Sequence, residues 1–270
     1  MSKIGSAIQD IHHIDTLAAK DQWVNHLHPL VKLIVTVCYI VAAASFSKYD
    51  VIGLAGMVVY PIAGFMLSEL SFWDSIKLLR LVLPLVCLLG ILNPFFDKNI
   101  LLIGGARVSA GILSMVVLML KGVFSVLASY LLIATTGMEK LCYAFCLLHI
   151  PKAIITQFML TYRYVTVLLE EADHITQAYA LRAPKQKGIH FKVWGSLTGQ
   201  LLLRSMDRAN TVYESMLLRG YAGNYQYMRE TLSIRGQDVA YGLFWMCVIV
   251  LFRVCPIMLI IGNLAGGMFA

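Results

Sequence analysis

The sequence has few charged residues, and few acidic ones in particular. Asp, Glu, Lys and Arg make up 14% of the 270 residues, with 15 acidic against 22 basic side chains. An average soluble domain has about 25% charged residues. Hydrophobic residues make up 59%, and the mean hydropathy is +0.74. This composition excludes an ordinary soluble domain and predicts a polytopic membrane protein.

The sequence also lacks the short motifs of common catalytic and nucleotide-binding sites. It contains no Gly-x-x-x-x-Gly-Lys-[Ser/Thr] phosphate-binding loop, no His-Glu-x-x-His and no Gly-x-Ser-x-Gly. No close pair of carboxylates lies in an apolar run. These absences exclude a self-contained ATPase and leave a membrane hydrolase without a visible catalytic group. We predict a non-catalytic chain with no cofactor of its own.

A disulfide framework is not indicated either. The six cysteines lie in apolar runs, mostly far apart, which favours small hydrophobic core residues. Only Cys142 and Cys146 are one helical turn apart, and that spacing is a weak metal-site pattern. The six positions are Cys38, Cys87, Cys142, Cys146, Cys247 and Cys255.

Positive charge is concentrated in one stretch. Of the 22 Lys and Arg residues, 11 lie between residues 152 and 235, less than a third of the chain. By the positive-inside rule this stretch faces the cytoplasm. A basic stretch can also bind nucleic acid, but apolar runs bracket this one and it contains no recognisable nucleic-acid module. A membrane-surface or protein-docking role is favoured, with no nucleic-acid partner.

The first 28 residues are polar to mixed. They lack the layout of a signal peptide, so we predict a retained cytoplasmic N-terminal tail. The tail contains five potential metal ligands, His12, His13, Asp15, His26 and His28, which invite a metal-site hypothesis. The favoured interpretation is that these histidines are solvated or cap the first span, and we predict no metal site.

Apolar runs predict an all-α fold with about five transmembrane helices, four in residues 29–136 and the last in 237–270. The runs are 30–46, 51–68, 81–96, 107–136 and 239–270, with an amphipathic interfacial helix near 68–80 and an outer loop over 97–105. Lys32 is expected at the cytoplasmic rim of the first. A helix over 107–136 would be about 45 Å long against a hydrocarbon core of about 30 Å. It must therefore tilt, protrude or bend, and doubling back is an open alternative.

Two cations lie in these apolar blocks. Lys121 is near the middle of the 107–136 block, where a charge is expensive and marks a functional-site candidate. Snorkelling or pairing with a partner subunit would also explain it. Arg253 lies close enough to the outer end of the last block to snorkel.

The basic region 137–236 predicts two long amphipathic helices that each end on an arginine. The first extends from Pro151 to about Arg182, because Pro184 disfavours helix in the residue before it. The second extends from about 193 to Arg219, because Gly220 is placed as a left-handed cap. A shift of 37 residues superposes the two segments and pairs Arg182 with Arg219.

An arginine in a last helical turn commonly complements the helix dipole. Two matched ones in a membrane protein favour a docking role. The candidate docking residues are Leu181, Arg182, Ala183, Leu218, Arg219 and Gly220. The residues expected to support the two helices are Arg163, Glu170, Glu171, Arg204, Asp207 and Arg208.

Three stretches resemble the transmembrane T component of energy-coupling factor transporters, the ABC-type importers of vitamins and transition metals. His28-Pro29-Leu30-Val31-Lys32-Leu33 resembles the family's Asp-Pro-Arg-x-Lys-Leu, with His and Leu where Asp and Arg are usual. The segments 161–183 and 205–221 resemble its two arginine-ended coupling helices. The extended N-terminal tail is more similar to the cobalt and nickel branch, which is CbiQ-like.

The resemblance implies a multi-pass cell-membrane protein with a cytoplasmic N-terminus. Two ABC-type ATPase subunits are expected to bind Arg182 and Arg219, and a separate metal-binding S component is expected to capture cobalt or nickel. The alternatives are a T component of a vitamin transporter and, in another class, a membrane-embedded lipid-modifying enzyme. Lys121 and the N-terminal histidines would form the site of that enzyme.

Overall fold

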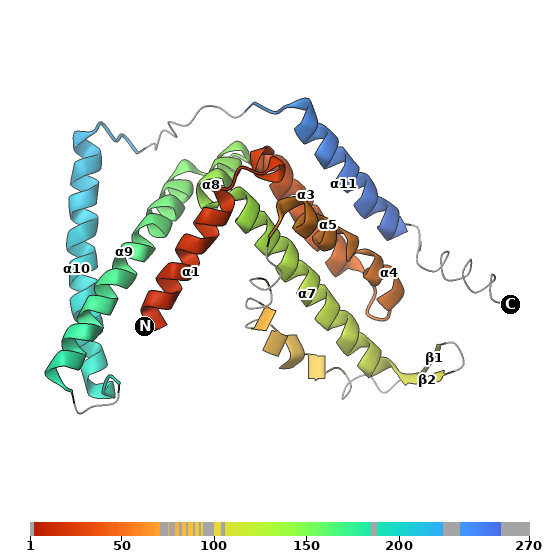
Figure 1. Ribbon diagram of the computed structural model, residues 1–270, viewed down its shortest axis with the longest axis horizontal. Helices are drawn as coiled ribbons and strands as arrows, with labels where there is room; N and C mark the ends of the chain where they lie inside the picture. The colour runs from red at the N-terminus through yellow and green to blue at the C-terminus, as the bar shows by residue number, and fades with distance from the viewer. Residues whose placement is uncertain are drawn as a thin grey trace. The chain divides into compact units, whose positions relative to one another are not determined.

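The computed structural model describes residues 3–70, 75, 79–80, 83–84, 86–88, 90–91, 93, 100–103, 106–184, 188–223 and 233–254. These residues are predominantly helical (Figure 1), so the predicted helical membrane fold is confirmed. The chain divides into two compact units. The membrane unit comprises Leu17–Gly137 and Leu232–Ala270, and the platform unit comprises Met1–Thr16 and Met138–Thr231.

Among its described residues the membrane unit contains two helices that are long and apolar enough to cross a bilayer, α7 (Ala110–Thr136) and α11 (Gly236–Val254). Only 33% and 17% of their most apolar segments are buried within the chain, which leaves the rest for lipid. The other elements are the helices α2 (Trp23–His26), α3 (Pro29–Ser45), α4 (Val51–Gly56) and α5 (Val59–Ser68), and the strands β1 (Ile100–Ile103) and β2 (Ala106–Ser109).

An aromatic cluster occupies the core of this unit. The rings of Tyr39 and Tyr60 stack at 4.4 Å, and Trp245 meets Tyr60 edge-on at 4.9 Å. These rings come from α3, α5 and α11, and all three are buried. Aromatic packing therefore joins α3 and α5 to α11.

The apolar run predicted over 51–68 is helical as α4 and α5, with a turn at 57–58 where the regular helical hydrogen bonding is interrupted. Pro61 has no backbone N–H and cannot bond the carbonyl of Met57 four residues earlier. The Tyr39 hydroxyl donates to that carbonyl instead, at 2.8 Å. The break is thus stabilised by a side chain from α3.

The helix predicted over 107–136 begins three residues later, at Ala110. Residues 106–109 form β2, which pairs with β1 in an antiparallel hairpin where the sequence predicts an outer loop. From Ala110 the helix is continuous for 27 residues, about 40 Å at 1.5 Å per residue. A continuous helix excludes doubling back within 110–136.

Lys32 lies in the first turn of α3. Its side chain is buried, and Nζ donates to the carbonyls of Val24 at 3.1 Å and Thr135 at 3.0 Å. Thr135 is in the last turn of α7, whose carbonyls have no helical donor. The lysine of α3 therefore satisfies backbone acceptors at the ends of α2 and α7.

One carboxylate joins the beginnings of α3 and α11. Asp238 is buried, with Oδ1 accepting from the backbone N–H of His28 at 2.8 Å and Oδ2 from that of Arg235 at 2.7 Å. The His28 ring accepts from the N–H of Leu30. The interpretation that a histidine caps the first span is confirmed for His28.

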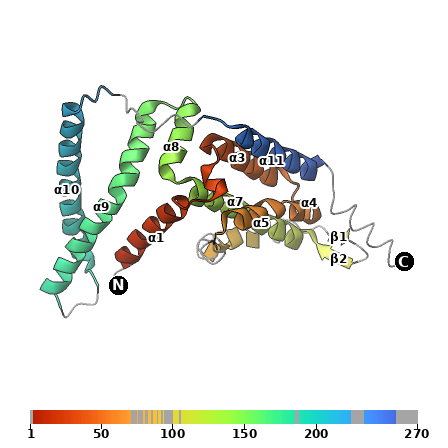
Figure 2. The ribbon, with the colours of Figure 1, turned by 45° about the horizontal axis from the view of Figure 1, so that its top comes forward.

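The platform unit is formed by α8 (Met138–Leu147), α9 (Lys152–Arg182), α10 (Phe191–Leu218) and most of α1 (Lys3–Ala18) (Figure 2). α9 contacts both α8 and α10. The segment predicted only as a tail is helical over 3–18. The Tyr162 hydroxyl of α9 donates to Oδ1 of Asp15 in α1 at 2.6 Å.

Several predicted features lie outside the described residues. They are most of the interfacial helix near 68–80, half of the span at 81–96, and residues 255–270 of the last block. α11 begins at Gly236, three residues before the apolar block predicted from 239.

Candidate functional site

The first predicted docking end is the C-terminus of α9. The helix ends at Arg182, as predicted. Ala183 leaves helical geometry at φ −128°, and its N–H still donates to the carbonyl of Tyr179 at 3.0 Å. The following residue is Pro184, so the cause of the helix end is local.

The second docking end is the C-terminus of α10, and it has a Schellman cap. Gly220 has φ +82°, its N–H donates to Leu217 at 2.9 Å, and the N–H of Tyr221 donates to Met216 at 3.0 Å. The prediction of a left-handed glycine cap is confirmed. The helix ends at Leu218 with Arg219 as its cap residue, one residue earlier than predicted.

The two ends present the same pair of side chains. Leu181 is 83% exposed and Leu218 is 90% exposed, each beside an exposed arginine. Neither the Arg182 side chain nor the Arg219 side chain makes a hydrogen bond or ion pair with any other part of the chain that the structure describes. Both guanidinium forks are therefore free to bind an acidic group. Their docking role stays a prediction.

Of the six supporting residues, the structure brings two together. Arg204 of α10 forms an ion pair with Glu171 of α9. Both side chains are partly exposed, so the pair contributes at most about 1 kcal/mol and mainly sets how the helices align. The other four residues are exposed and form no ion pair with the described chain: Arg163, Glu170, Asp207 and Arg208.

α10 exposes a large apolar surface that sequence analysis did not single out. Within the described residues none of its side chains is buried. An exposed apolar surface of this kind marks an interaction site for protein or membrane. Its most exposed large apolar residues are Phe191, Trp194, Leu202, Leu203, Met206, Tyr213 and Leu218.

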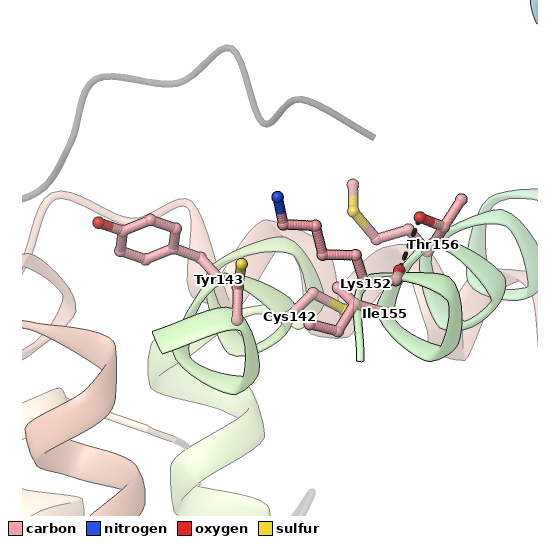
Figure 3. A pocket seen from close by; sticks show the side chains of 7 residues that line it. Cys142, Tyr143, Lys152, Ile155 and Thr156 are labelled. Carbon is pink, nitrogen blue, oxygen red and sulfur yellow. Dashed lines mark hydrogen bonds between the residues drawn. The ribbon is translucent and has the colours of Figure 1, made fainter. Parts of the chain in front are cut away.

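A small pocket lies between α8 and α9 and includes the Cys142/Cys146 pair. Figure 3 shows Cys142 and Tyr143 of α8 facing it together with residues of α9. Burial raises the pKa of Cys142, and the nearby Glu139 carboxylate raises it further. A protonated thiol is a poor metal ligand. Among the described residues there is no group of three His, Cys, Asp or Glu side chains placed to hold a metal ion.

The N-terminal histidines do not share one set of partners. His12 and His13 are exposed on α1, His26 pairs with Asp21, and His28 is the buried cap described above. Asp15 is engaged by Tyr162. Each potential ligand thus has its own local environment.

Lys121 has backbone partners rather than an acidic one. Its Nζ donates to the carbonyls of Ala44 at 2.9 Å and Phe46 at 2.6 Å, at the C-terminal end of α3. Arg253 donates to the carbonyl of Ser45 at 3.3 Å. Sequence analysis missed this role because a backbone carbonyl has no side-chain signature. The only sequence cue was a cation inside an apolar helix.

The architecture is that of a helical membrane protein with a platform of long amphipathic helices ending in exposed arginines. The family model described as cobalt transport protein, CbiQ, matches residues 20–228. The chain belongs to this family. The match includes α3, α7, α9 and both docking ends.

Similar proteins agree with this assignment. The energy-coupling factor transporter transmembrane protein EcfT of Listeria innocua is 24% identical over 228 residues, covering 75% of this chain and 82% of that protein. EcfT of Clostridium kluyveri is 24% identical over 224 residues, covering 75% and 81%. These matches confirm the resemblance drawn from the sequence.

A further relative matches over a shorter stretch. The uncharacterised protein MJ1089 of Methanocaldococcus jannaschii is 31% identical over 127 residues, 47% of this chain. The matched stretch covers 45% of that protein's own length, less than half.

Proposed function

We propose that this chain is the energy-coupling membrane subunit of an ATP-driven importer. Two ABC-type ATPase subunits dock on the ends of α9 and α10, and a separate membrane S component of the metal-binding type captures the substrate. The observation that carries the proposal is the pair of exposed Leu-Arg helix ends, which have no partner in the described chain. The chain itself is non-catalytic and binds no cofactor.

The geometry suits transmission of movement. α9 has 31 residues and α10 has 28, so each is a rod of roughly 45 Å. The ion pair between Glu171 and Arg204 links the two rods. A groove on each ATPase binds one of the two arginines. When ATP binding changes the distance between the two grooves, each helix moves as a whole. The apolar surface of α10 passes that movement to the next subunit.

Cobalt or nickel is the proposed substrate, supported by the description of the family to which the chain belongs. The lipid-modifying enzyme alternative loses support, because Lys121 is engaged by the carbonyls of α3 and His12 and His13 are exposed on α1. No second function is favoured by a specific observation.

Purification with native partners tests the function. The tagged chain, extracted from its own cells in mild detergent, should bring down two ATPase subunits and a small membrane protein. After reconstitution into vesicles, the complex should take up Co²⁺ or Ni²⁺ only with ATP. Omitting the ATPases is the control. A chain that purifies alone and turns over a lipid without ATP contradicts the proposal.

We also propose that the N-terminus and residues 138–236 are cytoplasmic, because half of all basic residues lie between 152 and 235. Single cysteines at Lys187 and Asn224, in a cysteine-free background, should resist an impermeant thiol reagent added to intact cells. A cysteine at Lys98, in the predicted outer loop, should react and serves as the control. Labelling of Lys187→Cys or Asn224→Cys from outside contradicts this topology.

A further inference from the structure

Two cations from different helices meet at the end of α3. Lys121 of α7 donates to the carbonyls of Ala44 and Phe46, at 2.9 and 2.6 Å. Arg253 of α11 donates to the carbonyl and hydroxyl of Ser45, both at 3.3 Å, and its guanidinium carbon lies 5.0 Å from the centre of the Phe46 ring. Both charges thus converge on three consecutive residues.

These charges are not neutralised within the described chain. Neither Lys121 nor Arg253 forms an ion pair there, and carbonyl groups offer dipoles but no net negative charge. Asp50 is the acidic residue nearest in sequence to the end of α3, and its Oδ1 accepts a hydrogen bond from the N–H of Gly53 at 2.8 Å. Two like charges held close together repel each other.

Both cations keep N–H donors that these contacts do not use. A lysine has three N–H donors and an arginine has five, and the carbonyl and hydroxyl contacts use only part of them. Arg253, Ala44 and Ser45 are exposed, and Lys121 is half-buried. A ligand approaching from outside the chain can therefore reach both cations.

The length of α3 places this cluster at the depth of lipid headgroups. The helix has 17 residues, about 25 Å, which is shorter than a hydrocarbon core of about 30 Å. A short helix is accommodated by local thinning of the bilayer or by flanking cations that snorkel to the headgroups. Phosphate groups and the two cations then occupy the same layer.

We propose that Lys121 and Arg253 together bind the phosphodiester of an anionic phospholipid. The phosphate oxygens accept charge-assisted hydrogen bonds from the unused donors, and its negative charge offsets the repulsion between the cations. A zwitterionic headgroup such as phosphatidylcholine fits less well, because its own ammonium adds a third positive charge. The site therefore selects phosphatidylglycerol or a headgroup of the same net charge.

Native mass spectrometry of the full chain in detergent tests the proposal. The chain is titrated with phosphatidylglycerol and, separately, with phosphatidylcholine of the same acyl chains. We expect tighter binding of phosphatidylglycerol. The preference should fall about five-fold when one cation is removed and about 25-fold when both are removed, since each juxtamembrane cation contributes about a five-fold factor.

The variants are chosen so that the carbonyls at the C-terminal end of α3 keep a hydrogen-bond donor. Lys121→Gln and Arg253→Gln each retain an amide N–H donor for the carbonyls of α3 while losing the charge. Arg163→Gln removes an exposed cation from α9 and should leave the preference unchanged. Thermal unfolding without lipid is measured for every variant, so that loss of fold is distinguished from loss of binding.

Two results overturn the proposal. One is equal binding of the two lipids by the wild-type chain, a comparison that needs no variant. The other is an unchanged preference in folded Lys121→Gln/Arg253→Gln. Displacement of the lipid by millimolar inorganic phosphate overturns the lipid as the occupant and assigns the site to free phosphate.

Discussion

Replacing both Arg182 and Arg219 with alanine is expected to release the ATPase subunits from the membrane complex. Docked in an acidic groove, each arginine makes charge-assisted hydrogen bonds away from water, and its truncation costs about 2 to 5 kcal/mol of affinity. If the arginines serve only the helix dipole, the loss is about 0.3 to 1 kcal/mol and the complex survives. The measurement is a pull-down of the ATPases with metal uptake, at matched membrane levels of the protein.

Lysine substitutions distinguish the docking role of the two arginines from the helix-dipole role. Arg182→Lys and Arg219→Lys keep the charge that a dipole needs but lose the planar fork, so they should rescue docking only in part. Lys192→Ala is a matched control, since this lysine is exposed, lies on α10 and forms no ion pair with described residues. If the Arg182→Ala/Arg219→Ala protein retains the ATPases as the wild type does, both arginines serve only the helix dipole.

The second large effect is expected from Asp238→Ala, and it concerns stability. This carboxylate accepts from the backbone N–H groups of His28 and Arg235 and joins the beginnings of α3 and α11. Alanine leaves both donors without their acceptor, so we expect the free energy of unfolding to fall by about 2 to 4 kcal/mol. Trp245 is buried in the same unit, and its fluorescence reports the unfolding in detergent.

Two further substitutions define the interaction. Asp238→Asn keeps one acceptor oxygen and should lose about half as much stability. Asp207→Ala removes an exposed carboxylate from α10 and should change stability by less than about 0.5 kcal/mol. If Asp238→Ala unfolds at the same temperature as wild type, the contact between α3 and α11 does not depend on this carboxylate.

The ends of the two platform helices could be predicted because their causes are local. Pro184 disfavours helix in the residue before it, and Gly220 adopts a left-handed conformation that other residues avoid. Both signals act within two residues of the arginine that they position. The apolar run that forms α7 could be predicted equally well, because apolar residues continue along the whole helix.

The interruption between α4 and α5 was only partly predictable from the sequence. Pro61 is visible in the sequence, but an isolated proline in an apolar run is also compatible with a continuous, kinked membrane helix. What makes the break here is the Tyr39 hydroxyl, which takes the carbonyl that Pro61 leaves free. That hydroxyl comes from a different helix, so no window of sequence contains both halves of the interaction.

By itself the sequence determined the membrane class, the apolar run that forms α7, the two long amphipathic helices and the residues at their ends. Only the tertiary structure decided what Lys32, Lys121, Asp238 and Arg253 do, because each binds backbone groups of another element. Every residue carries the same carbonyl and nearly every one the same N–H. The sequence therefore shows where the charged side chains are, but which backbone group each of them binds depends on how the helices pack.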